Sequence, residues 1–178
     1  MSLSLKERDR RHGELRKRMK EKSVNILFAF GDTGDFGLRY GNLRYLTNCK
    51  VIYGNSALVF PIDREPVMLM FSDLQAEWAK KLSWITEVRA SSNLISDIVK
   101  TLKSLGPNEK RIGVVSLASL PFSWYQTLRQ EFPSLDLIEM APVIGEMRQS
   151  KSEEEIELVK RSAQLEDKGF PELSRIIL

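Results

Sequence analysis

Two aspartates that follow apolar runs are the first residues in this sequence that could do chemistry. Asp32 comes shortly after the run Asn25–Phe30, and Asp63 shortly after the run Ser56–Phe60. Carboxylates at strand ends in an open α/β sheet often share a crevice, where they can hold Mg²⁺ for phosphoryl transfer. Aspartate is also a common turn residue after a strand, which is the plainer interpretation of both positions. We keep magnesium-dependent phosphotransfer or nuclease activity through Asp32 and Asp63 as an alternative function.

The stretch Gly31–Gly37, which reads GDTGDFG, is a second candidate because it is dense in glycine and follows an apolar run. Its GxxGxxG spacing differs by one residue from the GxGxxG pattern that binds dinucleotide phosphates. The residues that follow, Leu38–Asn42, do not begin an evident helix, which a phosphate site of this kind needs. A calcium loop would need a closing glutamate, which this stretch lacks. We therefore interpret Gly31–Gly37 as a turn that needs positive φ angles.

Cysteine and histidine, which commonly serve as nucleophiles, bases or metal ligands, occur once each. A single cysteine, Cys49, excludes a disulfide within the chain and favours a reducing compartment. A single histidine, His12, excludes an HExxH motif and any site with two histidine ligands, and it argues against a Ser-His-Asp triad. These counts leave few residues for catalysis. Our main prediction is that this chain has no catalytic residue, no cofactor and no metal site, and Mg²⁺ at Asp32 and Asp63 stays the alternative.

Hydropathy and the N-terminal residues bear on where the protein works. No apolar run approaches the roughly 20 residues that cross a bilayer. Met1–Leu5 leads directly into the charged residues Lys6–Asp9, so the apolar core of a secretory signal is missing. We expect a cytoplasmic protein with no membrane partner. Met1–Leu3 has the form of a leader derived from an expression vector.

The positive charge is concentrated in one segment near the N-terminus. The whole chain has a net charge of +3, and nine basic and four acidic residues lie between Lys6 and Lys22. A nucleic-acid arm is one interpretation. The segment has no interleaved aromatic residues for base stacking, and its acids are mixed with its bases. We therefore favour the solvated face of a first helix that docks through His12, Leu15 and Met19, and we predict no nucleic-acid partner.

Most of the remaining chain alternates between short apolar runs and helical patterns. With 178 residues, of which 42% are hydrophobic, the chain is long enough for a substantial core. The polar link Asp63–Glu65 is of hairpin length, so its flanking strands should pair antiparallel. We predict an α/β fold with a mixed, mostly parallel sheet of about six strands, one antiparallel hairpin and helices on both faces. The predicted strands cover residues 25–30, 56–60, 66–71, 86–89, 111–116 and 135–140.

Capping residues and apolar periodicity predict the helices between these strands. Ser72 begins a capping box, and an apolar residue follows at every fourth position. A second helix carries an apolar face from Leu94 to Leu105 and stops at Gly106, which is followed by proline. Pro121 opens a third helix. The apolar residues at fourfold spacing after Ser72 are Leu74, Trp78 and Leu82, and those of the third helix are Phe122, Tyr125 and Phe132.

The composition changes after Pro142. Ser152–Glu155 is another capping box, with its acids in the first turn, where they meet the positive end of the helix dipole. An apolar stripe follows, and we expect Gly169–Pro171 to kink or end the helix. An amphipathic helix that no strand follows has the character of the opening of a further domain. The stripe consists of Ile156, Val159, Ala163 and Leu165.

The order and spacing of several motifs are similar to those of a known family. Asn42–Thr47, then Ala57–Pro61 and Glu65–Leu69, resemble the N-terminal domain of the creatinase, prolidase and aminopeptidase P metallopeptidases. Met147–Arg148 and Lys151–Ile156 resemble the linker and first helix by which that family enters its catalytic "pita-bread" domain. The resemblance implies a creatinase N-terminal-like, ribonuclease H-like fold in residues 1–145. It also implies that residues 146–178 are the linker and first helix of a catalytic domain that this chain does not contain.

The resemblance implies a noncatalytic role for this chain. In that family two divalent metals, Mn²⁺, Co²⁺ or Zn²⁺, are held by acids and a histidine of the catalytic domain. The N-terminal domain narrows access so that short proline-containing peptides enter, and it supports homodimers or larger oligomers. By matching position, Tyr45, Thr47, Asn48 and Tyr53 are candidates to face the substrate, and the family usually has glycine where this chain has Asn48. A free-standing α/β binding or scaffold protein with the same fold is the alternative that we keep open.

Overall fold

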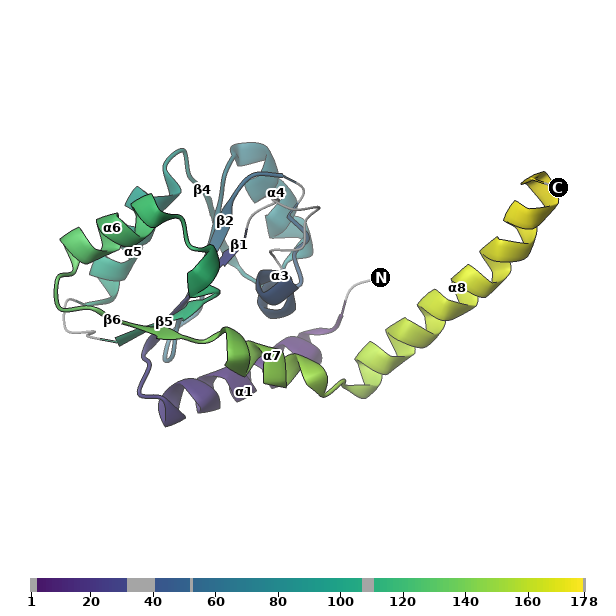
Figure 1. The fold of residues 1–178 in the computed structure, drawn as a ribbon, viewed down its shortest axis with the longest axis horizontal. Helices are drawn as coiled ribbons and strands as arrows, with labels where there is room; N and C mark the ends of the chain where they lie inside the picture. The colour runs from purple at the N-terminus through teal and green to yellow at the C-terminus, as the bar shows by residue number, and fades with distance from the viewer. Residues whose placement is uncertain (1–2, 32–40, 52, 107–110, 178) are drawn as a thin grey trace.

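Six strands form one sheet in the computed structural model, which describes residues 3–31, 41–51, 53–106 and 111–177 (Figure 1). Their order across the sheet is β4-β3-β2-β1-β5-β6. β2 runs antiparallel to both of its neighbours, and the other pairs are parallel. The predicted fold class and the antiparallel pairing of the hairpin are confirmed. The strands are β1 (Ile26–Gly31), β2 (Ser56–Pro61), β3 (Val67–Met70), β4 (Glu87–Ala90), β5 (Arg111–Val115) and β6 (Asp136–Glu139).

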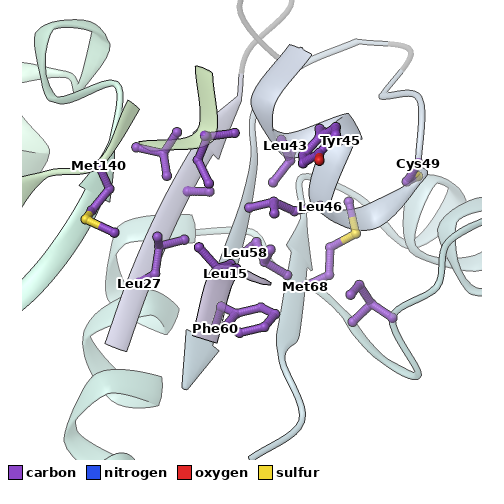
Figure 2. Close-up of a cluster of buried hydrophobic side chains, with 14 of the residues drawn as sticks. Leu15, Leu27, Leu43, Tyr45, Leu46, Cys49, Leu58, Phe60, Met68 and Met140 are labelled. Atoms are coloured by element: carbon purple, nitrogen blue, oxygen red, sulfur yellow. The ribbon is translucent and has the colours of Figure 1, made fainter. Parts of the chain in front are cut away.

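Helices cover both faces of the sheet, as predicted, and alternate residues of β1 point to opposite faces. Leu27 and Ala29 join one core with residues of α1, α3, α4 and α7, and Phe28 joins a second core with residues of α5 and α6. Figure 2 shows the first core, in which Leu15 of α1 and Leu46 of α3 lie over the sheet. The helices are α1 (Leu5–Glu21), α3 (Gly41–Thr47), α4 (Asp73–Leu82), α5 (Leu94–Leu105), α6 (Phe122–Glu131), α7 (Ala141–Gln149) and α8 (Glu153–Ile177), with a 3₁₀ turn, η2 (Leu117–Ser119).

The predicted helix boundaries are largely confirmed. The Ser72 hydroxyl accepts from the Gln75 N–H at the start of α4, and α5 ends at Gly106, whose φ of +122° favours glycine. The predicted docking stripe of α1 is also confirmed, because His12, Leu15 and Met19 are all buried.

The apolar stripe of α4 predicted the helix correctly but does not face the core. Its three large residues are 44% to 73% exposed, whereas Gln75, Ala76 and Ala79 are buried. The two alanines let α4 pack closely on β3 and β4, and this close packing leaves the bulky side chains outside. The exposed residues are Leu74, Trp78 and Leu82.

A similar difference occurs on α6. Phe122 is 71% exposed and stacks on Tyr125 at the surface, with ring centroids 6.5 Å apart. The contact with the core comes instead from Leu128, which is buried, and from Trp124, whose ring meets Phe30 edge to face at 4.9 Å.

Three helical segments differ from the expectation. Residues 41–47 form the helix α3, although the sequence around Leu38–Asn42 showed no evident helix start, and Leu43 and Leu46 are fully buried. Helix α7 was not predicted; it spans the expected domain boundary at residue 145, and Pro142 lies in its first turn, where a missing N–H is tolerated. Helix α8 does not end at Pro171 but continues to Ile177, and it projects away from the sheet (Figure 1).

The two aspartates of the phosphotransfer hypothesis follow strands that run in opposite directions. In the β1–β2 register, Gly31 lies opposite Ser56 and Ile26 lies opposite Pro61. Asp63 therefore follows β2 at the Ile26 end, whereas Asp32 follows β1 at its other end in the sequence. Asp32 and the rest of the glycine-rich stretch up to residue 40 lie outside the described residues. The register gives no support to a shared crevice.

Hydropathy along the helices bears on membrane insertion. Among the helices that the structure describes, none combines the length and apolar character needed to span a bilayer.

Candidate functional site

A cavity of about 530 Å³ lies where α3, α7 and the first turns of α8 meet α1. Its walls carry four cationic side chains and one carboxylate. Because the cations outnumber the carboxylate, the cavity favours anionic groups and carbonyl oxygens as ligands. It is lined by Leu3, Arg11, Gly41, Arg44, Tyr45, Asn48, Gly145, Arg148, Gln149, Lys151, Glu155 and Leu158.

Tyr45 forms part of the cavity wall and is held through its ring and its hydroxyl. The residue is 6% exposed, and its hydroxyl donates to the carbonyl of Met147 in α7 at 3.2 Å. The guanidinium carbon of Arg11 lies 4.0 Å from the ring centroid, a cation–π contact. Burial raises the pKa of the Tyr45 phenol, so the hydroxyl stays a donor at neutral pH.

Arg11 is buried and connects three helices. Its Nε donates to Glu7 Oε1 at 2.7 Å within α1, and its Nη1 donates to the Tyr45 carbonyl at 2.7 Å in α3. Its Nη2 pairs with Glu155 Oε1 at 3.0 Å in α8. Each side of the guanidinium therefore meets a different partner, and the charge is compensated although Arg11 is only 3% exposed.

Glu7 is the second buried charge of this network. Burial by itself raises the pKa of its carboxyl, but hydrogen bonds from Arg10 and Arg11 outweigh burial and lower that pKa to about 2. Both carboxylate oxygens accept from Arg10, at 2.8 and 2.7 Å. Glu7 therefore stays ionised throughout the physiological pH range.

The first turn of α8 is attached to the start of α1 by a second set of contacts. The backbone N–H and hydroxyl of Ser4, the N-cap of α1, donate to Glu154 at 2.6 and 2.7 Å. The predicted capping box of α8 is confirmed, because Ser152 N donates to Glu155 Oε2 and Glu155 N donates to the Ser152 hydroxyl. These contacts, together with the Arg11 pair, hold the direction in which α8 leaves the body of the molecule.

The opposite wall of the cavity is cationic and more accessible. Arg148 Nη1 donates to Asn42 Oδ1 at 2.8 Å, and a Cβ at Gly41 would lie 3.2 Å from Arg148 Nη2. Glycine at this position therefore allows the guanidinium to approach the start of α3. Arg44 and Lys151 are exposed beside it.

The structure brings two of the four predicted substrate-facing residues together. Tyr45 and Asn48 both line the cavity. Asn48 has a φ of +56°, a left-handed conformation that asparagine and glycine adopt more readily than other residues. Thr47 is fully buried; its hydroxyl donates to the Leu43 carbonyl and accepts from the Cys49 N–H.

Tyr53 lies elsewhere, on the surface beside α4, where it is 45% exposed and packs edge to face on Phe71. It is not among the residues that line the cavity. A contact of any of the four residues with substrate stays a prediction.

The single histidine and the single cysteine are both structural. Burial is the largest effect on His12 and lowers its pKa, while its Nε2 lies 2.8 Å from the Leu46 carbonyl and its ring meets Phe60 edge to face. Burial raises the pKa of the Cys49 thiol to about 11, so the reactive thiolate is scarce. Within the described ranges, no three His, Cys, Asp or Glu side chains are close enough to hold a metal ion, so these residues do not fit the metal pair of the resembled family.

Sequence reasoning missed Arg11, Glu155 and Arg148 as parts of this site. The charged segment Lys6–Lys22 was interpreted as a solvated helix face, so Arg11 was not distinguished from the exposed charges around it. A usable signal was present, because Glu7, Arg11, Leu15 and Met19 recur at every fourth position and share one face of α1.

Three solved structures are similar to this chain in fold. An X-Pro aminopeptidase from Thermotoga maritima MSB8 has a TM-score of 0.75 and 17% identity, over 90% of this chain and 42% of that one. The prolidase from Pyrococcus horikoshii OT3 has a TM-score of 0.67 and 20% identity, over 88% of this chain and 40% of the prolidase. The Creatinase/Prolidase N-terminal domain of an X-Pro dipeptidase from Streptococcus pyogenes has a TM-score of 0.55 and 17% identity, over 77% of this chain and 98% of that domain. The chain therefore spans about two fifths of the aminopeptidase and of the prolidase.

The comparison of sequences points to the same domain. No curated protein matches this chain. The family model described as the Creatinase/Prolidase N-terminal domain matches residues 11–150, which include the sheet, α7 and Arg11 of the buried network. This chain belongs to the Creatinase/Prolidase N-terminal domain family.

Proposed function

We propose that this chain is the noncatalytic N-terminal domain of an Xaa-Pro peptidase, where it restricts access to a catalytic domain whose first helix is α8 and supports oligomers. The observation that carries the proposal is the cavity at the point where the chain passes into α8. Tyr45 and Asn48 give it a rigid polar wall, and Arg44, Arg148 and Lys151 give it a cationic one. Carboxylate and carbonyl oxygens of a short proline-containing peptide suit such a lining.

The chemistry of peptide hydrolysis belongs, in this proposal, to the following domain. Two divalent metals such as Mn²⁺, Co²⁺ or Zn²⁺ would be bound there, because the described residues of this chain offer no suitable donor cluster. The role of this chain is geometric. The contacts of Arg11 and Ser4 with the first turn of α8 hold that helix in one direction and so set where the following domain lies. A single cysteine, with no second one in the chain to form a disulfide, supports a cytoplasmic location.

The gene itself provides the first test. The coding sequence after Leu178 is read and, where it continues in frame, the whole protein is expressed and assayed with Mn²⁺ and Xaa-Pro dipeptides. We expect cleavage by the whole protein and none by residues 1–178 alone. Cleavage by residues 1–178, or tight stoichiometric Mn²⁺ uptake by them in calorimetry, contradicts the proposal. A stop codon directly after Leu178 favours the free-standing binding or scaffold protein instead.

Substrate restriction is tested on the whole protein with Arg148→Ala. Removing this side chain widens the cavity and deletes one cationic group, so kcat/KM for Xaa-Pro octapeptides should rise several-fold relative to that for the dipeptide. Arg64→Ala is the matched control, because Arg64 is an exposed arginine in the link between β2 and β3 and does not line this cavity. An unchanged ratio of octapeptide to dipeptide cleavage in Arg148→Ala would show that the cavity does not select by length.

A further inference from the structure

The first turn of α8 is attached to the start of α1 by polar contacts. Glu154 accepts from the backbone N–H and the hydroxyl of Ser4. Glu155 pairs with Arg11 at 3.0 Å and with Arg10 at 3.5 Å. Among the α8 side chains that the structure describes, none is buried. The attachment therefore depends on charge-assisted hydrogen bonds rather than on the apolar packing that holds most helices in a fold.

The groups of α1 that hold α8 have other partners within the body of the molecule. Arg10 and Arg11 both donate to Glu7, and Arg11 also donates to the Tyr45 carbonyl. The Ser4 hydroxyl accepts from the Glu7 N–H and so caps α1 whether or not α8 is attached. Release of α8 would therefore leave neither a buried ion without a partner nor α1 without its cap, which are the costly outcomes.

The two acids of α8 also keep favourable surroundings when the contacts with α1 are broken. Glu155 Oε2 accepts from the Ser152 N–H within the capping box of α8 itself. Both acids lie in the first turn, near the positive end of the helix dipole. Since Glu154 and Glu155 are only half-buried, water can solvate the oxygens that α1 gives up. The attached and the released arrangements therefore both satisfy their polar groups, and the free-energy difference between them is small.

A short link between α7 and α8 provides a hinge. Helix α7 ends at Gln149 and α8 begins at Glu153, so three residues join them. Ser150, the first of these, has an extended backbone, with φ of −84° and ψ of 116°. Hinges commonly consist of a few residues between elements, and α8 leaves the body of the molecule at this link as one continuous helix (Figure 1).

Rotation about this link would change the cavity beside α8. Lys151, Glu155 and Leu158 line the cavity from the link and from α8, and its other lining residues belong to the body of the molecule. Release of α8 takes this wall away, so the cavity becomes wider. It also moves the carboxylate of Glu155 away from Arg11 and the other cations of the cavity, which makes the cavity more positive.

We propose that α8 is a hinged helix held by an electrostatic latch, and that ionic strength sets how far the cavity beside it is open. The latch consists of Ser4, Arg10 and Arg11 on the α1 side and of Glu154 and Glu155 on the α8 side. Salt screens the ion pairs and shifts the population toward the released arrangement. The regulation of substrate access rests on the proposed function, in which peptides enter this cavity, whereas the movement of α8 does not depend on it.

Double electron–electron resonance measures the movement in residues 1–178. Spin labels on Lys20→Cys and Gln164→Cys, at exposed positions of α1 and α8, report the distance between the two helices. The native Cys49 is buried and stays unlabelled. We expect a narrow distance distribution in about 10 mM NaCl and a broad one in about 1 M NaCl, because the Debye length falls from about 30 Å to about 3 Å. A distribution that salt does not change overturns the inference.

Glu155→Gln tests the latch without added salt. Glutamine still completes the capping box with Ser152, but it removes the charge that pairs with Arg11, so the broad distribution should appear at low salt. Glu153→Gln is the matched control, because it neutralises an exposed acid of the same turn that is no part of the latch. Circular dichroism verifies that both variants keep their helix content. Equal distributions in the two variants overturn the latch.

The whole protein separates this inference from the proposed function. Glu155→Gln should raise the ratio of octapeptide to dipeptide cleavage several-fold at low salt, and added salt should raise it in the unaltered protein. Salt-dependent distances with an unchanged cleavage ratio overturn the regulation of the cavity by α8. Absence of Xaa-Pro cleavage by the whole protein contradicts the proposed function instead, and the spin-label distances still decide whether α8 moves.

Discussion

Helices α1 and α8 are both charged and amphipathic, yet they relate to the rest of the molecule in opposite ways. In α1, Leu15 and Met19 have no exposed surface, and the charged residues Glu7 and Arg11 are buried with them. In α8, every residue from Val159 to Pro171 is exposed. The contact between the two helices lies at their N-terminal ends, where Glu154 and Glu155 meet Ser4 and α1 arginines.

The difference shows what allows a charged helix to be buried. The charges of α1 are tolerated in the interior because Arg11 is bonded to α1, α3 and α8 at once. Among the residues that the structure describes, the stripe of α8 has no comparable neighbour, and the contacts that hold that helix lie at its N-terminal end. Removing a buried charge from α1 should therefore lower the free energy of unfolding strongly, and removing an apolar group from α8 should lower it little.

The largest effect is expected from Arg11→Met. The variant leaves Glu7 buried with Arg10 as its remaining cationic partner and takes one ion pair from Glu155. Breaking a buried pair on one side costs about 3–5 kcal/mol, so the urea midpoint should fall sharply. Arg18→Met is the matched control, because Arg18 forms a partly exposed pair with Glu14 in the same helix, and its loss should change the urea midpoint far less. Equal losses in the two variants would contradict the special role of Arg11.

Acidification tests the same network without a substitution. The Glu7 pKa is about 2 in the folded chain against an ordinary value of 4.5, so the unfolded state binds the proton first as pH falls. The contribution of ionised Glu7 to the free energy of unfolding is present above pH 4.5. It is lost as the pH falls from about 4.5 to 2, and the loss is at most about 3 kcal/mol. Burial also lowers the pKa of His12 in the folded chain, so the unfolded state binds a proton at this residue first. The His12 contribution to stability is therefore lost at higher pH than that of Glu7, as the pH falls below 6.5. Urea unfolding at several pH values should show the lower step flattened in Glu7→Gln, and an unaltered step would refute the assignment.

The sequence was sufficient to predict the sheet and most helices because short apolar runs and capping residues are local signals. It was insufficient for the face that α4 buries. Fourfold spacing of Leu74, Trp78 and Leu82 identifies a helix, but Ala76 and Ala79 on the other side pack closer to the strands. Which face of α4 is buried depends on how closely its side chains fit the sheet, and that fit exists only in the assembled fold.

The candidate site was predictable in part for the same reason. Tyr45 and Asn48 were identified through the family resemblance, and the φ of +56° at Asn48 is a conformation that asparagine and glycine adopt more readily than other residues. Arg11 was not found because its burial depends on Glu155, which lies 144 positions later in the chain. The acids of α8 were interpreted through the helix dipole alone, a local effect that carries no information about a distant partner.

The smallest effect is expected from Val159→Ser in α8. Val159 is 63% exposed, so the substitution removes little buried surface and should change the free energy of unfolding by no more than about 0.5 kcal/mol. Leu15→Ala in α1 is the contrast, with an expected cost of about 2–5 kcal/mol because Leu15 is fully buried. Both variants are measured by urea unfolding of residues 1–178. A loss of 2 kcal/mol or more in Val159→Ser would mean that the stripe of α8 packs against this chain or a second copy in solution, and the contrast between the two helices would then be wrong.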